Sequence, residues 1–236
     1  MKKYSSFLIA LSFIIFATSY AHAQLGIQAG YAYTMNNGNL TLGQQNHFSG
    51  NLTNSGFQAG LTYDFNFAKT NFAIQTGVIY SIYAGNTKEQ SKKVGNIYGT
   101  LTSNTTYQYL NVPLRVAYSL VVDNNLRIFF FAGPNFTYGL SAKMNEAKII
   151  GEYSIGGNTE QIIKGYDIYD AYKKELSRFD MQIGVGGGVH YKRYRLQVGY
   201  DFGILNTYTG QTVRNINGAI NKLKRDQLFV SLGYTF

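Results

Sequence analysis

The residues from Tyr107 to Ala142 alternate between apolar side chains and small or polar ones, with one polar interruption at residues 123–125. An alternation with a period of two predicts β-strands that each have one apolar face, and the interruption predicts a tight turn between two such strands. Each strand is about as long as the roughly 9–11 residues with which a tilted strand crosses a bilayer. This stretch therefore predicts a membrane-crossing β-hairpin.

The two faces of this hairpin differ in chemistry along its whole length. The apolar face carries Leu110, Val112, Leu114, Val116, Tyr118, Leu126, Ile128, Phe130, Ala132, Phe136, Tyr138 and Leu140. The opposite face carries Asn111, Pro113, Arg115, Ala117, Arg127, Gly133, Asn135, Thr137, Gly139 and Ser141. Residues that share a face must pair across the strands, so the loop must hold an odd number of residues.

A three-residue loop at residues 123–125 pairs Val122 with Leu126, and it sets Arg115 opposite Gly133 and Leu114 opposite Pro134. The only two prolines of the chain, Pro113 and Pro134, then lie close together on neighbouring strands. Because proline removes a donor from the ladder, we expect a local bulge there, with the Arg115 guanidinium reaching inward over Gly133.

Six further segments alternate in the same way, at residues 25–33, 56–65, 72–83, 179–191, 194–204 and 227–236. Long turn-rich segments (36–54, 85–105, 143–177 and 206–224) alternate with short turns near 68–70, 123–125 and 192–193. Short periplasmic turns and long outer loops are typical of membrane barrels with an even number of strands. The sequence predicts an all-β fold: an eight-stranded antiparallel up-and-down transmembrane β-barrel, with both termini on the periplasmic side. The segment 165–176 is a weak helix candidate within the longest loop.

A soluble barrel would alternate as well, so the composition of the less apolar face decides between the two. That face carries Gly, Gln, Asn, Thr and Ser with few charges, whereas a face toward water would carry Lys and Glu. An eight-stranded lumen is just wide enough to be filled by side chains, and glycine suits such close approach. Aromatic residues also gather near both expected membrane interfaces, as in outer-membrane barrels. Toward the periplasm these are Phe65, Phe72, Tyr118, Tyr191, Tyr194, Tyr234 and Phe236, and toward the outside Tyr33, Phe57, Tyr80, Tyr138 and Phe179.

The first 23 residues have the pattern of a cleaved export signal. Lys2 and Lys3 precede an apolar run, and residues 21–23 form a small-x-small cleavage site. We expect a barrel domain over residues 24–236 in the outer membrane of a Gram-negative bacterium. The chain contains no cysteine, which excludes disulfides and a cysteine-linked lipid anchor.

The formal net charge is +9, or +7 without Lys2 and Lys3. Export argues against nucleic acid as a partner. Basic loop residues are instead expected to meet the phosphates of an anionic outer leaflet, together with the other outer-membrane lipids.

Several short motifs resemble the PorT-like family of outer-membrane β-barrels. The strand Tyr109-Leu110-Asn111-Val112-Pro113-Leu114 resembles its "YLEIPL" strand, and residues 131–134 resemble the "AGP" that follows. Phe179-Asp180 with the later glycines 184–188 is similar to a further strand of that family. The chain departs from the pattern at Asn111, where an acidic residue is common. The resemblance implies a small exported barrel, and some members are associated with protein secretion. The terminal Tyr234-Thr235-Phe236 is similar to the aromatic signal recognised by the barrel-assembly machinery, a further expected partner.

Seven ionisable residues fall on the inward face: Asp64, Arg115, Arg127, Asp180, His190, Arg195 and Asp201. An unpaired charge away from bulk water is costly, so we expect these residues to form a structural plug of salt bridges. An inward Ser231 with His190 leaves a lipid-modifying hydrolase as a remote alternative, but no Ser/His/Asp spacing supports it. Three scattered histidines without cysteine predict no metal site, and no cofactor motif is present.

We therefore expect a monomeric, non-enzymatic barrel that acts structurally or as a binding and assembly platform. A protein partner would bind through the loops 143–177 and 206–224, because specific function concentrates in loops. A small passive channel and a secretion-associated component are the alternatives.

Overall fold

The computed structural model describes residues 21–42, 46–94, 97–155, 158–166, 169–173, 176–209 and 222–236. This part of the chain forms ten β-strands and one short 3-10 turn. They are β1 (Ala21–Leu42), β2 (Asn46–Phe67), β3 (Phe72–Val94), β4 (Ile97–Asp123), β5 (Leu126–Ile155), β6 (Asn158–Tyr166), β7 (Tyr169–Asp170), η2 (Ala171–Lys173), β8 (Phe179–Tyr191), β9 (Tyr194–Gly203) and β10 (Lys222–Thr235). Among the described residues, no helix is long and apolar enough to cross a membrane.

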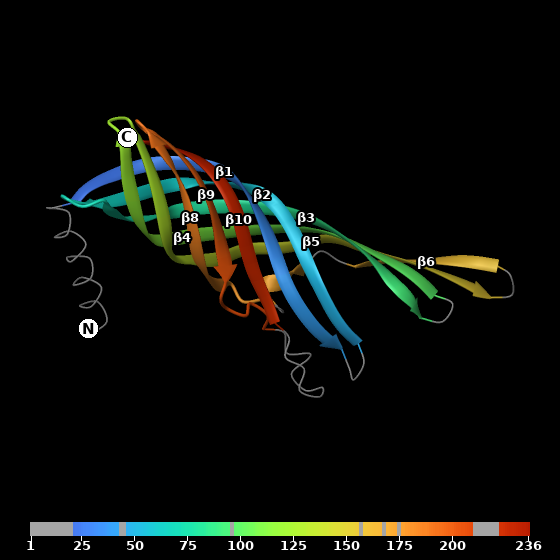
Figure 1. Ribbon diagram of the computed structural model, residues 1–236. Helices are drawn as coiled ribbons and strands as arrows, with labels where there is room; N and C mark the ends of the chain where they lie inside the picture. Colours follow the sequence, from blue (N-terminus) through green and yellow to red (C-terminus); the bar gives the residue numbers. More distant parts are fainter. Residues whose placement is uncertain are drawn as a thin grey trace, which may run out of the picture.

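Eight of the strands close into an antiparallel barrel (Figure 1). The strands neighbour one another in the order β4, β3, β2, β1, β10, β9, β8 and β5, and β5 pairs back with β4. The first and last strands of the chain lie side by side, with Ile27 opposite Tyr234. Closure removes the free edges of the sheet, so every strand at the level of the barrel has two hydrogen-bonded neighbours. The predicted eight-stranded up-and-down barrel is confirmed.

The two faces of the barrel wall have opposite character. Large apolar side chains point outward and stay exposed, for example Leu25, Ile27, Phe57, Leu61, Val116, Leu196, Val230 and Leu232. Polar side chains point inward and are buried, for example Gln28, Gln58, Asn111, Gln182, Gln197 and Ser231. An apolar surface of this extent around a polar interior needs an apolar solvent, which the hydrocarbon region of a bilayer supplies.

The register of the β4–β5 hairpin agrees with the prediction, but its turn does not. Pro113 pairs with Asn135 and Val116 with Ala132, so Arg115 stands opposite Gly133 as expected. The turn, however, holds only residues 124–125, and Leu126 pairs with Asp123.

The predicted bulge at the prolines is therefore wrong. The described ladder between β4 and β5 shifts register at three places, and none of them is at the prolines: between Asn104 and Thr105, between Gln108 and Tyr109, and between Val121 and Asp123. At the last of these, beside the turn, one extra residue keeps like faces paired. Near the prolines the ladder only skips two pairs, and Gly133 takes a φ of 154°. A Cβ at Gly133 would come within 2.3 Å of the carbonyl oxygen of Leu114, so the close approach of β4 requires glycine there.

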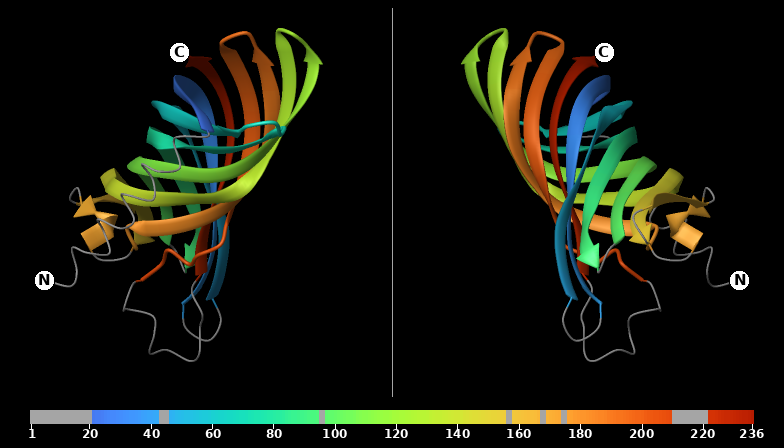
Figure 2. Two further views of the ribbon diagram at one scale, coloured as in Figure 1. Left: turned by 90° about the vertical axis from the view of Figure 1, so that its left-hand side faces the viewer. Right: turned by 90° about the vertical axis from the view of Figure 1, so that its right-hand side faces the viewer.

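Three of the four predicted outer loops are largely strands. β1 and β2 stay paired up to Leu42 and Asn46, and β3 and β4 up to Val94 and Ile97. β5 continues to Ile155 and turns back as β6, so that the hairpins project beyond the barrel (Figures 1 and 2). Outside the bilayer both faces of a strand meet water. The alternation that reveals a strand then disappears, while its backbone hydrogen bonds remain.

Three further predictions concern the helix candidate, the fourth loop and the signal segment. The helix candidate at 165–176 is wrong where it is described, because β6, β7 and η2 occupy that stretch. Of the fourth predicted loop, residues 210–221 lie outside the described residues, and β10 already begins at Lys222. Residues 1–20 of the predicted signal also lie outside the described residues. Strand β1 begins at Ala21, three residues before the expected N-terminus of the mature chain at Gln24.

Candidate functional site in the barrel lumen

The centre of the lumen holds a cross-barrel ion pair between β4 and β9. Nη2 of Arg115 donates to both carboxylate oxygens of Asp201, at 2.9 and 3.1 Å. Both side chains are buried, and Asn135 adds a hydrogen bond to Asp201 at 3.2 Å. The carboxylate thus accepts three hydrogen bonds, from two donor groups, as a buried charge requires.

Two further ion pairs lie above and below this centre. Toward the periplasmic end, Arg195 of β9 is paired with Asp64 of β2. Toward the outer end, Nε of Arg225 on β10 is 3.1 Å from Oδ2 of Asp180 on β8. All four side chains are buried. Polar contacts accompany the pairs along the lumen, such as that between the amides of Gln197 and Gln28.

Arg225 was absent from the predicted set, although the sequence holds the signal that finds it. Its Nη2 donates to Thr137 at 2.9 Å and to Gln182 at 3.3 Å, so it is the centre of the outer part of the network. The expected last strand began at Gln227, which left Arg225 unassigned. Side chains alternate between the two faces of a strand, so Arg225, two residues before the inward Gln227, also faces the lumen.

The other two predicted members, Arg127 and His190, do not join the buried ion pairs. Arg127 is exposed near the short turns, and the His190 ring lies 4.8 Å from the ring of Phe129. Both line a polar vestibule of about 250 Å³ at the periplasmic end, together with Lys192 and Arg193. Both residues therefore lie at the solvent-accessible end of the lumen and not in its buried centre.

Three phenylalanines pack the lumen between the ion pairs. Phe129, Phe131 and Phe229 are buried, and the guanidinium carbon of Arg115 is 4.7 Å from the ring centre of Phe131 and 4.9 Å from that of Phe229. The sequence interpretation placed Phe229 inward but passed over the other two, which share the parity of Arg127.

Glycines on the facing strands make room for these rings. A Cβ at Gly186 would lie 2.3 Å from Cζ of Phe131, and one at Gly199 would lie 2.6 Å from Cζ of Phe229. Within the glycine-rich stretch 184–188, aromatic packing in a narrow barrel thus explains Gly186, and also Gly188, whose Cβ would lie 2.8 Å from Cζ of Phe129.

A short segment closes part of the outer mouth, and we call its residues 169–173 and 176–178 the outer strap. β7 pairs with Lys143 and Met144 of β5, and Arg178 donates to the carbonyl oxygens of Gly139 and Leu140. The ring of Tyr172 packs on Gly139. Burial raises the pKa of the Tyr172 hydroxyl to about 12, so the group stays protonated at neutral pH.

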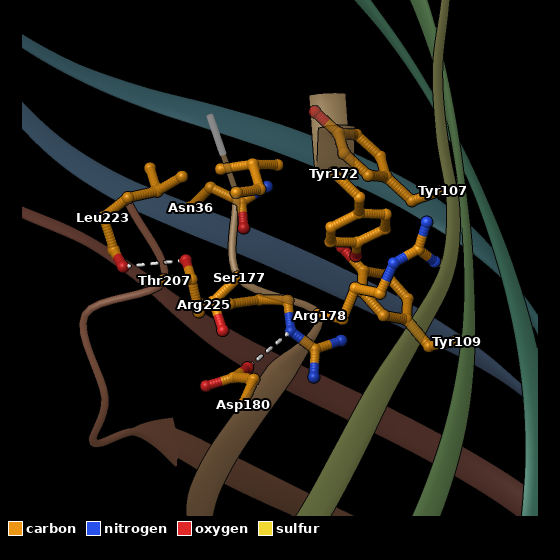
Figure 3. A pocket seen from close by; sticks show the side chains of 11 residues that line it. Asn36, Tyr107, Tyr109, Tyr172, Ser177, Arg178, Asp180, Thr207, Leu223 and Arg225 are labelled. Carbon is orange, nitrogen blue, oxygen red and sulfur yellow. Dashed lines mark hydrogen bonds and ion pairs between the residues drawn. The ribbon is translucent and has the colours of Figure 1, made fainter. Parts of the chain in front are cut away.

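Beneath the strap lies a small pocket of about 40 Å³, shown in Figure 3. Its lining combines three tyrosines with the outermost ion pair: Asn36, Tyr107, Tyr109, Tyr172, Leu176, Ser177, Arg178, Asp180, Thr207, Leu223 and Arg225. Because this lining comes from five separate parts of the chain, only the closed barrel brings it together.

The residues of the remote hydrolase alternative do not form a catalytic arrangement. Ser231 Oγ is buried and has no hydrogen-bond partner in the described part of the chain, and His190 packs on Phe129. In the described ranges, no group of His, Cys, Asp and Glu side chains has a metal-binding arrangement.

The C-terminal aromatics lie on the periplasmic edge of the barrel. Tyr234 packs between Tyr194 and Phe236, with ring centres 5.5 and 5.6 Å away, and the amide of Phe236 donates to Leu25. Phe72 and Tyr118 pack in the same way on the neighbouring part of the wall. The rings thus form part of an interfacial girdle.

Comparison with known proteins points to the same kind of fold. The model of a family described as "Outer membrane protein beta-barrel domain" matches residues 17–209. No curated protein matches the chain.

Among solved structures, the chain is similar to Neisserial surface protein A, with 12% identity, a TM-score of 0.40, and 91% of this chain and 99% of that chain covered. It is also similar to OprG from Pseudomonas aeruginosa (14% identity, TM-score 0.42, 92% and 97% covered). Ail from Yersinia pestis shows 15% identity and a TM-score of 0.34, with 91% and 99% covered. The closed strand order, and not these distant likenesses, defines the barrel.

Proposed function

The chain belongs to the outer membrane protein beta-barrel domain family, and on that premise we propose that it is a non-enzymatic barrel with a closed lumen. In this proposal it acts structurally or as a binding platform through its extracellular hairpins. The single observation that best supports a closed lumen is the stack of three buried ion pairs with three phenylalanine rings packed between them.

The size of the central cavity supports closure. Between Gln28, Asn111, Arg115 and Phe229 the lumen leaves about 10 Å³, which is about the room that one water molecule needs. A hydrated ion is larger than this, and passage would require the buried pair of Arg115 and Asp201 to separate. Separation would leave two charges in a confined space without partners, which is costly.

Planar-bilayer conductance of the refolded mature chain tests the closed lumen. We expect no steady conducting events from the wild type. A widened variant, Arg115→Ser with Phe129→Ser and Phe131→Ser, should conduct, which shows that the assay detects an open barrel of this size. Steady conductance of the wild type would instead support the passive-channel alternative.

The platform role rests on the hairpins that project beyond the apolar belt. β5 and β6 form a paired extension from Ala147 to Tyr166, which holds its backbone in a defined shape. We propose that a protein partner binds at 143–177, to which this extension belongs, or at 206–224, of which residues 210–221 lie outside the described residues. Basic residues of the outer segments are proposed to contact an anionic outer leaflet.

Photo-crosslinking in cells tests the platform role. A crosslinking residue at Thr159 in β6 should capture a discrete protein, and the same residue at Lys192 in a periplasmic turn serves as the matched control. Crosslinks to lipid alone from position 159 would argue for a structural role without a protein partner.

The finer assignments also belong to this proposal. The PorT-like motifs at 109–114 and 131–134 make a secretion-associated component the alternative role. We further propose removal of residues 1–23 on export, residence in a Gram-negative outer membrane, and recognition of Tyr234 and Phe236 by the barrel-assembly machinery.

A further inference from the structure

The pocket under the outer strap has a floor that is electrostatically neutral. Arg225 is paired with Asp180 at 3.1 Å, and Arg178 lies 3.7 Å from Asp170. Each guanidinium that lines the pocket thus has a carboxylate beside it. A neutral ligand suits this site better than an anion or a cation, since a net charge would meet the like charge of one partner at short range.

The floor also offers a spare donor and a spare acceptor. Nη1 of Arg225 and Oδ1 of Asp180 are buried and have no hydrogen-bond partner among the described residues, and both side chains are more than nine-tenths buried. A buried polar atom without a partner is costly, so a ligand that satisfies both atoms gains binding free energy. Adjacent hydroxyl groups do this well, because each hydroxyl both donates and accepts.

The walls of the pocket are aromatic. The rings of Tyr107 and Tyr109 are nearly parallel, with an angle of 8° and ring centres 6.2 Å apart. The guanidinium carbon of Arg225 lies 4.2 Å from the ring centre of Tyr109, and the three rings stand together beside the ion pair of Arg225 and Asp180 in Figure 3. Ring faces and edges of this kind provide apolar surface for C–H groups next to hydroxyl hydrogen bonds.

We propose that this pocket binds the edge of a neutral saccharide, with hydroxyl groups on Arg225 and Asp180 and ring C–H groups against the tyrosines. The volume of about 40 Å³ is room for roughly three water molecules, so it admits two neighbouring hydroxyls or one hydroxymethyl group and not a whole sugar ring. The rest of the saccharide extends outward past the strap. The site lies at the mouth opposite the short turns, and it does not require that the lumen below be closed.

Saturation-transfer NMR on the refolded mature chain tests the proposal, in a detergent without a sugar headgroup. Methyl glycosides of neutral hexoses form the first arm, and the lipid-free oligosaccharide of the outer-leaflet glycolipid forms the second. We expect transfer to a neutral sugar in at least one arm, and little transfer to glucuronate or glucose 6-phosphate. The responding arm identifies the source as a soluble saccharide or the glycolipid.

Three variants separate a binding site from a merely structural cluster. Tyr109→Ala should weaken binding about tenfold, the loss expected for one good contact, whereas Tyr138→Ala on the lipid face of the neighbouring strand should not. Asp180→Asn leaves the charge of Arg225 uncompensated, so selectivity should shift from neutral sugars toward glucuronate. Folding of each variant is checked by the difference in gel mobility between heated and unheated samples.

Two results would overturn the proposal. One is the absence of transfer from every neutral sugar to a wild-type barrel that is shown to be folded. The other is transfer that Tyr109→Ala and Asp180→Asn leave unchanged, since this would place the sugar elsewhere on the barrel. Neither result depends on the conductance experiment, so the closed lumen and the saccharide site can fail separately.

Discussion

The outer and inner faces of the barrel wall are made by the same strands and follow different rules. Leu114 and Arg115 are neighbours in β4, yet the two residues are 46% and 6% exposed. Leu114 needs only an apolar surrounding, which any lipid chain supplies. Arg115 needs one particular carboxylate, Asp201, on a strand 86 residues further along the chain.

Substitutions on the two faces of the wall therefore act in different ways. On the lipid face each residue contributes through its own transfer free energy, so the effect of a substitution depends on depth and polarity alone. In the lumen each residue is part of a pair or a packed group. The effect of a substitution then depends on whether the partner residue still has a hydrogen bond or an ion pair after the change.

The largest effect is expected from Arg115→Leu. The change leaves Asp201 buried without its main partner, which should lower the free energy of unfolding by about 3–5 kcal/mol. Reversible denaturant titration of the barrel from lipid vesicles measures it. The matched control is Arg127→Leu at the exposed rim, expected within about 0.5 kcal/mol of wild type. Equal effects of the two changes would mean that the central pair contributes nothing specific.

Leu114→Arg is expected to follow, with a loss of about 2–4 kcal/mol for a charge on the lipid face near the middle of the bilayer. The same titration measures it, and Leu114→Phe should be nearly neutral because the side chain stays apolar. If the arginine at position 114 is tolerated while Arg115→Leu stabilises the barrel, the two faces have been assigned in reverse.

Strand parity explains how much of this could be predicted from the sequence. The faces of the strands at membrane level follow from alternation alone, and the register of Arg115 opposite Gly133 follows from the rule that like faces pair. The outer extensions were missed because water bathes both of their faces and erases the alternation. The bulge was misplaced for a related reason. A two-residue turn with one extra residue at Val122 keeps like faces paired just as a three-residue loop does, so the sequence does not distinguish them.

The site itself was only partly predictable, for a geometric reason. Inward position can be read along one strand, but the partner across the lumen cannot, because the barrel must close before Asp64 meets Arg195. The alternation predicts a last strand that begins at Gln227, and this boundary leaves out Arg225. The outer pocket joins Tyr107, Tyr172 and Arg225, which no local pattern connects.

Lumenal packing is tested by Gly186→Ala, where a smaller loss is expected. The added Cβ would lie 2.3 Å from Cζ of Phe131 and 2.4 Å from the carbonyl oxygen of Val198, and overpacking of this kind typically destabilises a protein by about 1–3 kcal/mol. Gly187→Ala is the comparison on the other face, where the added Cβ would lie 2.9 Å from the backbone carbonyl oxygen of Phe129 and should cause a smaller loss. Phe131→Leu should restore part of the stability of Gly186→Ala. Equal stability of the two alanine variants would show that the lumen is not packed at this level.

The smallest net effect is expected when both members of the central pair become apolar. Arg115→Met with Asp201→Leu removes both charges together, and replacing a buried pair by apolar side chains of similar size is often close to neutral, here within about 1 kcal/mol. Asn135 loses Asp201, but its NH2 group keeps Gln182 as an acceptor at 3.1 Å. The titrations of the two single variants and the double variant give the coupling free energy directly. If the double variant is as unstable as Arg115→Leu, the charges stabilise the lumen by something other than their pairing with each other. The inner face would then differ from the outer face in more than its need for paired residues.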